Sequence, residues 1–304
     1  MRKIVLSLVL LFSFISAGSA ATYYISPSGN DSTGNGTSGN RWATLTKAFS
    51  MMNGGDTLIV GDGTYTGGAN RISTNNAFPP KGTSSAWTNI QAEHDGMAIF
   101  DGQGTNEMLW ITWGPACYFT FTGLIWTGTK DTTALVNYSD HIKFFRCGAY
   151  DAADGNNVNF EAENSQYILF ENCYAWGSGR YKFSFYLDQF CIMRNCVGRL
   201  DYVNAGTEPI AIFTVYSSSG CEIQNCIAID SDQTSKYLSA GTTYDLGGAF
   251  YNPATSGLCQ NINWTNNIAL NVAIGGAGCA GNGEPYNADN ITFKNCLWWH
   301  ISNM

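Results

Sequence analysis

Four aspartates recur five to seven residues after a repeated anchor position, and their carboxylates could bind a cation. They are Asp151, after the anchor Arg146, Asp201, after Asn195, and Asp230 and Asp232, after Asn225. If the repeats stack as coils, Asp201 and Asp230 lie on adjacent coils about 4.8 Å apart. Carboxylates held so close either repel each other or share a cation, and Ca²⁺ prefers oxygen ligands. The spacing therefore predicts a calcium site at this corner, and the alternative is an acidic corner that solvent alone stabilises.

Lys182 is the residue that we expect to act as a general base. Alternation along residues 181–185, Tyr-Lys-Phe-Ser-Phe, predicts that the aromatic side chains point inward and that Lys182 points outward. Asn159 of the preceding repeat then lies beside Lys182, and Glu161 lies diagonal to it, so both could contact a substrate. A lysine accepts a proton only when neutral, so burial or the neighbouring Arg180 must lower its pKa. The alternative is an exposed lysine that discourages edge pairing.

Aromatic residues at the corners could bind sugars. Trp176, Tyr202 and Tyr216 fall at or beside predicted corners, where a ring face could stack on a pyranose. Because the chain contains 9 Trp and 16 Tyr, packing within the core or at a corner is the alternative for each ring.

A repeat organises the chain around these residues. Its pattern is apolar, any, apolar, any, Asn, Cys, any, apolar or small, as in residues 168–175, 221–228 and 291–298. The anchor positions are 123, 146, 172, 195, 225, 266 and 295, with spacings of 23, 26, 23, 30, 41 and 29 residues. Repeats in a fixed register at such spacings predict a solenoid.

The units of this solenoid are strands, because the apolar residues within each repeat alternate with a period of two. A second short strand precedes each anchor by about 14 residues, as in 158–160, 181–185 and 211–215. Asparagine at the anchor favours the left-handed conformation of a corner and can bond to the next corner. We therefore predict an all-β fold, a right-handed parallel β-helix in which each coil is stabilised by its neighbours.

The two ends of the solenoid differ. Leu45, Ala48, Phe49 and Met52 recur with helical spacing and are followed by two glycines, which predicts an amphipathic helix that caps the first coil. The expected cap segment is 21–56, and the β-helix covers 57–304. The chain stops six residues after the repeat 291–298, so we expect a fragment or a last coil that another chain covers through end-to-end self-association.

The first 20 residues have the order of a secretory signal peptide. Arg2 and Lys3 precede the apolar run 4–15 and the small residues 17–21, so we expect export to the extracellular space or the periplasm. No later segment is apolar and long enough for a membrane span. The remaining chain has 13 basic against 23 acidic residues, a balance that argues against a nucleic-acid partner.

The cysteines follow the coils. Five of the ten, Cys147, Cys173, Cys196, Cys226 and Cys296, occupy one register, and Cys191 and Cys221 occupy another. We interpret the first set as small apolar residues of a buried stack, because stacked thiols have no unique pairing. For Cys191 and Cys221 a disulfide and a pair of thiols are equally compatible with the spacing.

The opening of the chain, with Tyr23-Tyr-Ile-Ser-Pro-Ser-Gly-Asn-Asp31, Trp42-Ala-Thr-Leu45 and Gly55-Asp56-Thr57, resembles that of secreted β-helix proteins of the pectate lyase-like superfamily. With the coil repeat, the resemblance covers essentially the whole chain after the leader. It implies the architecture and says little about the reaction, because the superfamily includes lyases, glycoside hydrolases and adhesins.

If the mechanism also resembles that of the superfamily lyases, Lys182 is the base that removes the proton next to a uronate carboxylate. Arg180 then holds that carboxylate, and Ca²⁺ assists. Asp154, in Ala153-Asp-Gly155, resembles the Asp-Gly corner of one lyase family whose aspartates bind Ca²⁺. An ion pair with Arg180 is the alternative for Asp154.

This sequence also departs from these families. Residues 176–180 are Trp-Gly-Ser-Gly-Arg, where that lyase family carries further aspartates, and no histidine lies between two glycines, as the hydrolase branch requires. Two functions stay open: a protein that binds or cleaves polysaccharide, by Ca²⁺-assisted elimination on an acidic glycan, and a non-catalytic surface, adhesive or assembly protein.

Overall fold

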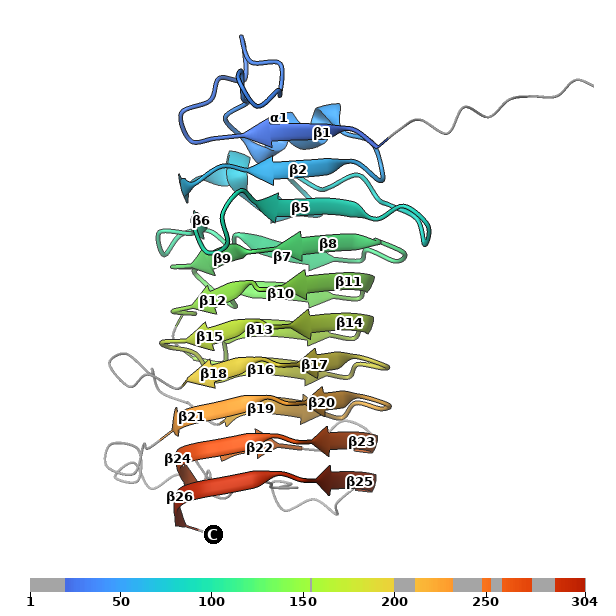
Figure 1. Ribbon diagram of the computed structural model, residues 1–304, viewed down its shortest axis with the longest axis vertical. Coiled ribbons are helices and arrows are strands. Elements are labelled where there is room, and N and C mark those ends of the chain that lie inside the picture. Colours follow the sequence, from blue (N-terminus) through green and yellow to red (C-terminus); the bar gives the residue numbers. More distant parts are fainter. Residues whose placement is uncertain are drawn as a thin grey trace, which may run out of the picture.

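Three short strands form each turn of the chain, and each strand pairs in parallel with its equivalents in the turns before and after. The computed structural model describes residues 20–153, 155–199, 211–231, 248–252, 259–274 and 288–303. The predicted leader lies outside this range except for Ala20. Figure 1 shows the turns stacked along one axis, and the fold is the expected right-handed parallel β-helix.

The first strands of the turns form one continuous sheet, called here the first sheet. It consists of β1 (Thr22–Ile25), β2 (Thr57–Val60), β5 (Thr88–Ala92), β8 (Phe119–Thr122), β11 (Asp140–Phe145), β14 (Gln166–Glu171), β17 (Ile192–Arg194), β20 (Glu222–Gln224), β23 (Cys259–Thr265) and β25 (Ala288–Lys294).

The second strands form the second sheet. It consists of β3 (Gly63–Tyr65), β6 (Ala98–Asp101), β9 (Leu124–Thr127), β12 (Gly148–Tyr150), β15 (Tyr174–Trp176), β18 (Val197–Arg199), β21 (Ile227–Ser231), β24 (Ile268–Ile274) and β26 (Leu297–Asn303).

The third sheet carries the candidate site. It consists of β4 (Ile72–Ser73), β7 (Leu109–Thr112), β10 (Ala134–Asn137), β13 (Val158–Glu163), β16 (Tyr181–Tyr186), β19 (Ala211–Tyr216) and β22 (Gly248–Tyr251). It joins the second sheet where Gly248 of β22 pairs with Ile274 of β24.

Aromatic ladders fill the interior. On the third sheet the rings of Phe160 and Phe183 lie 5.3 Å apart and those of Phe183 and Phe213 lie 5.1 Å apart. All three residues are fully buried. Because equivalent side chains repeat every coil, each ring gains its contacts from its neighbours along the stack, as expected for a solenoid.

The predicted corners have the expected left-handed backbone. The φ angle at the anchors is 55° at Asn172, 54° at Asn195, 54° at Asn225 and 57° at Asn266. Asn225 Nδ2 donates to Asn195 Oδ1 at 3.2 Å, and Asn266 Nδ2 donates to Asn225 Oδ1 at 3.1 Å. The corner asparagines therefore hold the conformation and also connect adjacent coils.

The predicted amphipathic helix is present as α1 (Leu45–Met51), which lies at the N-terminal end of the stack in Figure 1. Thr44 is its N-cap, and its hydroxyl accepts from the backbone N–H of Lys47 at 3.2 Å. Leu45, Ala48 and Phe49 are buried. A single turn of 3₁₀ helix, η1 (Gly68–Asn70), contacts α1.

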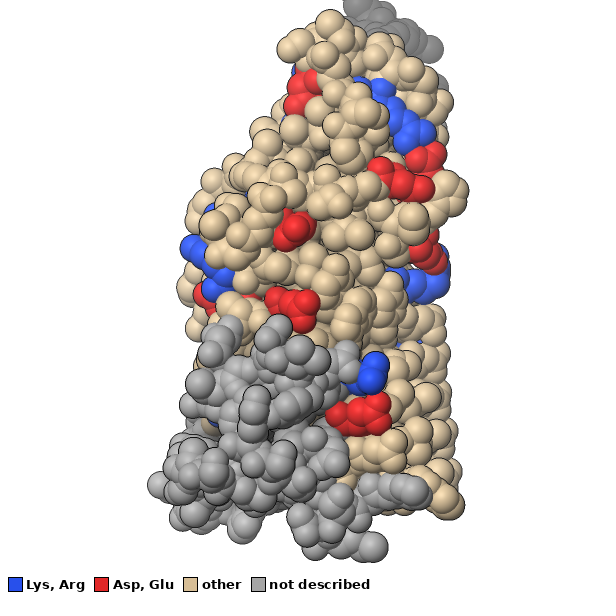
Figure 2. Space-filling view, turned by 90° about the vertical axis from the view of Figure 1, so that its left-hand side faces the viewer, with Lys and Arg blue, Asp and Glu red and all other residues tan. Residues whose placement is uncertain are grey.

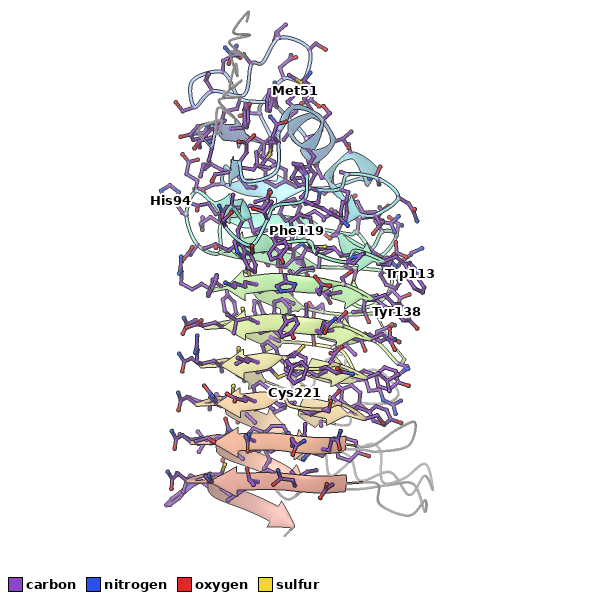
Figure 3. The ribbon with its side chains drawn as sticks, turned by 90° about the vertical axis from the view of Figure 1, so that its right-hand side faces the viewer. Met51, His94, Trp113, Phe119, Tyr138 and Cys221 are labelled. Atoms are coloured by element: carbon purple, nitrogen blue, oxygen red, sulfur yellow. The ribbon has the colours of Figure 1, made fainter. Side chains whose placement is uncertain are left out.

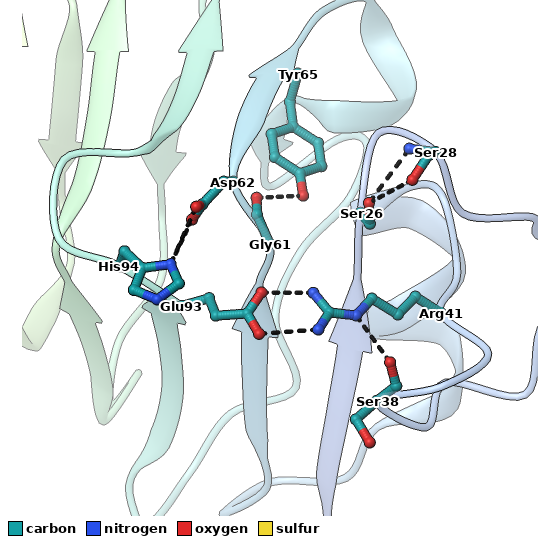
Figure 4. A network of polar contacts seen from close by, with 9 residues as sticks. All are labelled: Ser26, Ser28, Ser38, Arg41, Gly61, Asp62, Tyr65, Glu93 and His94. Atoms are coloured by element: carbon teal, nitrogen blue, oxygen red, sulfur yellow. Dashed lines mark hydrogen bonds and ion pairs between the residues drawn. The ribbon is translucent and has the colours of Figure 1, made fainter.

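The cap is fixed to the first coils by polar contacts (Figure 4). Arg41 makes two hydrogen bonds with the carboxylate of Glu93, 2.6 and 2.8 Å long. The hydroxyl of Tyr65 donates to Gly61 O at 2.8 Å. The two Arg41–Glu93 bonds join residues 52 positions apart in sequence, so they set how the cap sits on the solenoid. The Tyr65 bond is local, between residues four positions apart.

The nine cysteines among the described residues are thiols, and all except Cys296 are buried. The sulfur of Cys173 donates to Phe144 O and that of Cys196 to Phe170 O, both at 3.4 Å and both on the preceding coil. The interpretation of this register as a buried stack is therefore confirmed for Cys147, Cys173, Cys196 and Cys226, whereas Cys296 is half-buried. Cys191 and Cys221 are likewise free thiols and are fully buried. Figure 3 labels Cys221.

The described surface carries few charges, as Figure 2 shows for one face. No helix in the described part of the chain combines the length and apolarity of a membrane span. On the last described strand, β26, Leu297 and Trp299 are 51% and 58% exposed. The end-to-end self-association expected there stays a prediction.

Candidate functional site

A cavity of about 280 Å³ opens on the outward face of the third sheet, over β13, β16 and β19. We call it the groove. Its lining residues are Asn156, Val158, Glu161, Arg180, Tyr181, Ser184, Tyr186 and Tyr216. Four of the predicted site or neighbouring residues, Glu161, Arg180, Tyr181 and Tyr216, are thus brought together from three successive coils.

The start of each groove strand breaks the expected alternation. Tyr181 is level with Val158 and Ala211, and these three form a small cluster separate from the main core. Ile212, one position later, belongs to the main core together with Phe213. Two consecutive positions therefore face inward, and the residue before them faces the groove.

This arrangement corrects the predicted orientation of Lys182. The side chain is 0% exposed, and its ammonium donates to Gly177 O at 2.6 Å and to Gly179 O at 3.2 Å. Lys182 thus stabilises the turn between β15 and β16 from inside the molecule. Tyr181, which we expected to point inward, lines the groove instead.

Asn159 is buried together with Lys182. It occupies the level position on the preceding coil and is 0% exposed, and neither atom of its amide group has a hydrogen-bond partner. The expected contact between Asn159 and a substrate is therefore not possible in this structure.

Arg180 and Tyr181 form the polar centre of the groove. Arg180 Nε donates to the Tyr181 hydroxyl at 3.3 Å, and the guanidinium carbon lies 5.6 Å from the centre of the Tyr181 ring. Burial raises the pKa of Tyr181, while the charge and hydrogen bond of Arg180 oppose this effect. The hydroxyl is therefore a proton donor held beside a cation.

Glu161 faces the same groove from the preceding coil. Its side chain is half-buried, and its carboxylate accepts from the Thr132 hydroxyl at 3.2 Å. Burial and the charge of Glu163 raise the pKa of Glu161 to about 8, and Asp131 adds to the effect. A carboxyl with this pKa can exchange a proton near neutral pH, as a general base or acid must.

Two tyrosines lie at one end of the groove. The rings of Tyr186 and Tyr216 are 4.8 Å apart, at corresponding positions on β16 and β19. Tyr216 was expected to contact sugar, and its position in the groove is compatible with that role. Tyr202 lies outside the described residues.

Trp176 lies elsewhere. It ends β15 on the second sheet, where its ring stacks on Tyr150 at 4.4 Å and on Tyr174 at 5.2 Å. It does not line the groove, so the structure does not bring this predicted sugar contact together with Arg180.

Two of the five predicted calcium ligands can be assessed. Asp230 pairs with Arg199 at 3.1 Å and accepts from Asn271 Nδ2 at 3.1 Å. Asp151 accepts from the backbone N–H of Ser178 at 3.3 Å. Both carboxylates therefore already interact with hydrogen-bond donors or a cation.

Asp154, Asp201 and Asp232 lie outside the described residues. Within the described ranges, no three His, Cys, Asp or Glu side chains form a group that could hold a metal ion. The calcium site therefore stays a prediction.

Sequence reasoning missed Ser184, Tyr186, Asn156 and Val158 as lining residues. Strict alternation identifies Ser184 as outward but gives no reason to select it. The segments 158–160 and 181–183 read apolar, polar, apolar, which is ordinary alternation, so they gave no signal that Asn159 and Lys182 are buried.

No family model matches this sequence, and no curated protein matches it either.

Solved structures with the same fold share little sequence with it. A pectate lyase is 16% identical with a TM-score of 0.57, and the match covers 91% of this chain and 78% of the lyase. An alginate lyase from Paenibacillus is 16% identical with a TM-score of 0.52, covering 92% of this chain and 99% of the lyase. A lacto-N-biosidase from Eubacterium ramulus is 10% identical with a TM-score of 0.57, covering 90% and 59%. These similarities establish the β-helix fold.

Proposed function

We propose that this protein binds an acidic polysaccharide in the groove and cleaves it by β-elimination. The observation that carries the proposal is the Arg180–Tyr181 contact in the same cavity as Glu161. A cation, a hydroxyl that holds its proton and a carboxyl that titrates near neutral pH are the three groups that this reaction needs.

Each residue has one role in the proposed reaction. Arg180 binds the carboxylate of a uronate unit and so makes the neighbouring C–H bond more acidic. Glu161, as carboxylate, takes that proton. The bond between the sugar carbon and the glycosidic oxygen breaks, the leaving oxygen takes the proton of the Tyr181 hydroxyl, and a carbon–carbon double bond remains.

Two observations support an acidic substrate. Among the solved structures with this fold, two are named as lyases of pectate and alginate, which are acidic polymers. In the groove, Arg180 is the only Lys or Arg among the lining residues, so a substrate carboxylate has one defined cationic partner there. The leader-like first 20 residues predict export from the cell, and such polymers occur outside cells.

The test is to incubate the protein with a panel of uronate polymers, with and without Ca²⁺, and to follow the ultraviolet absorbance of the unsaturated product. We expect Glu161→Gln to lose about 10²- to 10⁴-fold in kcat, the usual contribution of a general base. Tyr181→Phe should also lower kcat, because the leaving oxygen then has no hydroxyl proton to take. Glu171→Gln is the matched control, because Glu171 is on the first sheet and pairs with Arg194 at 2.7 Å.

The pH profile separates elimination from hydrolysis. If Glu161 is the base, kcat/KM rises with pH and levels off above an apparent pKa near 8. Glu163 lies two residues away on the same strand face, so a hydrolase could use Glu161 as acid and Glu163 as base. Activity would then fall above the same pKa, and the product would not absorb.

A non-catalytic adhesive or assembly role is the second candidate, since the groove could hold a glycan without cleaving it. Retention on immobilised polymer, with no product from any member of the panel, would favour this role and contradict the lyase proposal.

A further inference from the structure

Six rings gather along one edge of the solenoid, at the turn from the third sheet to the first. We call this set the aromatic edge; it consists of Trp113, Tyr118, Tyr138, His141, Tyr167 and Phe190. Figure 3 shows Trp113 and Tyr138 next to each other on this edge. The groove does not include any of these residues.

The rings form two rows, and each row runs across successive coils with one ring from each coil. Trp113 and Tyr138 stack with centroids 4.0 Å apart and planes inclined by 1°. In the second row, His141 lies 4.5 Å from Tyr118 and 4.9 Å from Tyr167, and Tyr167 lies 5.6 Å from Phe190. The edge thus presents a regular array of aromatic groups.

Local backbone preference does not explain these residue types. The φ angles are 56° at Trp113, 46° at Tyr138 and 57° at Tyr167, in the left-handed region that favours Gly and Asn. Other coils use the favoured types at the same corners: Asn164 follows Tyr138 in the first row, and Gly220 follows Phe190 in the second. Stacking offsets part of the conformational cost of the rings.

The rings are nevertheless left in contact with solvent. Trp113 is 69% exposed although one face stacks on Tyr138, so its other face is open. Tyr138, Tyr167 and Phe190 are 42%, 47% and 51% exposed. Contiguous exposed rings of this kind are typical of binding surfaces.

The chemistry of the edge fits a sugar polymer. Five of the six rings also carry a hydrogen-bonding atom, which suits a ligand that has both C–H faces and hydroxyl groups. One ring nitrogen of the edge already has a partner: His141 Nδ1 lies 2.7 Å from Asp140 Oδ1.

The edge is also continuous with the groove. Tyr138 directly follows Asn137, which is level with Glu163 on β13, and Glu163 is level with Tyr186 on β16. Tyr186 lines the groove. A polymer that occupies the groove can therefore continue over this corner onto Tyr138 and Trp113.

We propose that the aromatic edge is a second polysaccharide-binding surface, which holds the part of the polymer that extends beyond the groove. The inference rests on the proposed function for the identity of its ligand. Binding at the edge requires no cleavage, so it can be measured separately.

The test uses the double variant Trp113→Asn/Tyr138→Asn, which introduces the residue type found at the same corner in the next coil. Leu187→Asn is the matched control, because Leu187 has the same corner position with φ of 58° and no ring. Binding is measured by affinity electrophoresis in gels that contain polymers of the uronate panel. We expect the double variant to bind polymer about tenfold more weakly and the control to bind like the original protein.

Kinetics give a second readout. On polymer, KM should rise in the double variant while kcat stays unchanged, and on an oligosaccharide short enough to fit the groove neither constant should change. If the original protein binds polymer through the edge but forms no product, the inference stands and the lyase proposal fails. Equal binding by double variant and original, equal loss in the control, or a change in sedimentation without a change in glycan binding would each overturn the inference.

Discussion

Glu161 is a carboxyl whose ionisation opposes folding. Its pKa is raised from 4.5 to about 8, mainly by burial and then by the charge of Glu163. Below pH 4.5 the group is protonated in the folded and the unfolded chain, so it costs nothing. As pH rises toward 8 the unfolded chain ionises first, and the folded state loses stability relative to it.

We therefore expect Glu161→Gln to change how stability depends on pH. The original protein should lose about 1 to 3 kcal/mol of unfolding free energy between pH 5 and 9 through this group, a value reduced for its access to solvent. The variant should lack this loss. Urea unfolding at a series of pH values measures it, with Asp188→Asn, a second buried carboxyl with a raised pKa, analysed in parallel. Curves with the same pH dependence in the Gln variant and the original would contradict the assignment.

Lys182 has a structural role that a variant can separate from catalysis. In Lys182→Met the carbonyl groups of Gly177 and Gly179 lose a buried donor, so we expect about 2 to 3 kcal/mol lower stability. The folded variant should keep kcat within a few fold, because Lys182 does not line the groove. A loss of 100-fold or more in kcat with stability unchanged would restore Lys182 as the base.

At one corner of the solenoid, a row of asparagine side chains forms hydrogen bonds from each coil to the next. Asn225 combines a φ of 54° with side-chain bonds to Asn195 and Asn266. The conformation and the bonds are separate contributions, because glycine can supply the first without the second.

We expect Asn225→Gly to cost about 1 kcal/mol and Asn225→Ala to cost about 1 kcal/mol more, since alanine also disfavours the left-handed region. Thermal unfolding of the two variants measures the difference. Equal stability of the Gly and Ala variants would show that the backbone conformation contributes nothing at this corner.

At the scale of the whole molecule, the stacking of coils buries all but one of the thiols that the structure describes. Eight of the described cysteines have buried side chains, and they come from the coils between Cys117 and Cys259. Their protection is therefore a property of the assembled solenoid and not of any one strand.

We expect these eight thiols to react with a thiol reagent only after denaturation, while Cys296, which is half-buried, reacts earlier. Mass spectrometry after labelling in native buffer and in denaturant assigns the sites. Failure of Cys191 and Cys221 to label even in denaturant without reductant would instead indicate a disulfide between them.

Much of this architecture follows from local sequence. Period-two alternation determines the strands, the spacing of Asn172, Asn195 and Asn225 determines the coils, and Thr44 with the apolar spacing after it determines α1. Each of these signals lies within a short segment of sequence. Because each coil repeats the same contacts with its neighbours, one register then fixes many positions. The interpretation of Cys147, Cys173 and Cys196 as a buried stack follows from that same register.

The period-two alternation of the sequence did not predict which side chains form the candidate site. A two-residue inward step at the start of β13, β16 and β19 places Tyr181 in the groove and buries Lys182. The raised pKa of Glu161 comes mainly from burial, which depends on how the coils pack, and then from the charges of Glu163 on the same strand and Asp131 on the preceding coil. The sequence thus determined the solenoid and its register, while tertiary structure decided which side chains face solvent at the groove, because two consecutive inward positions reverse inside and outside at the start of these strands.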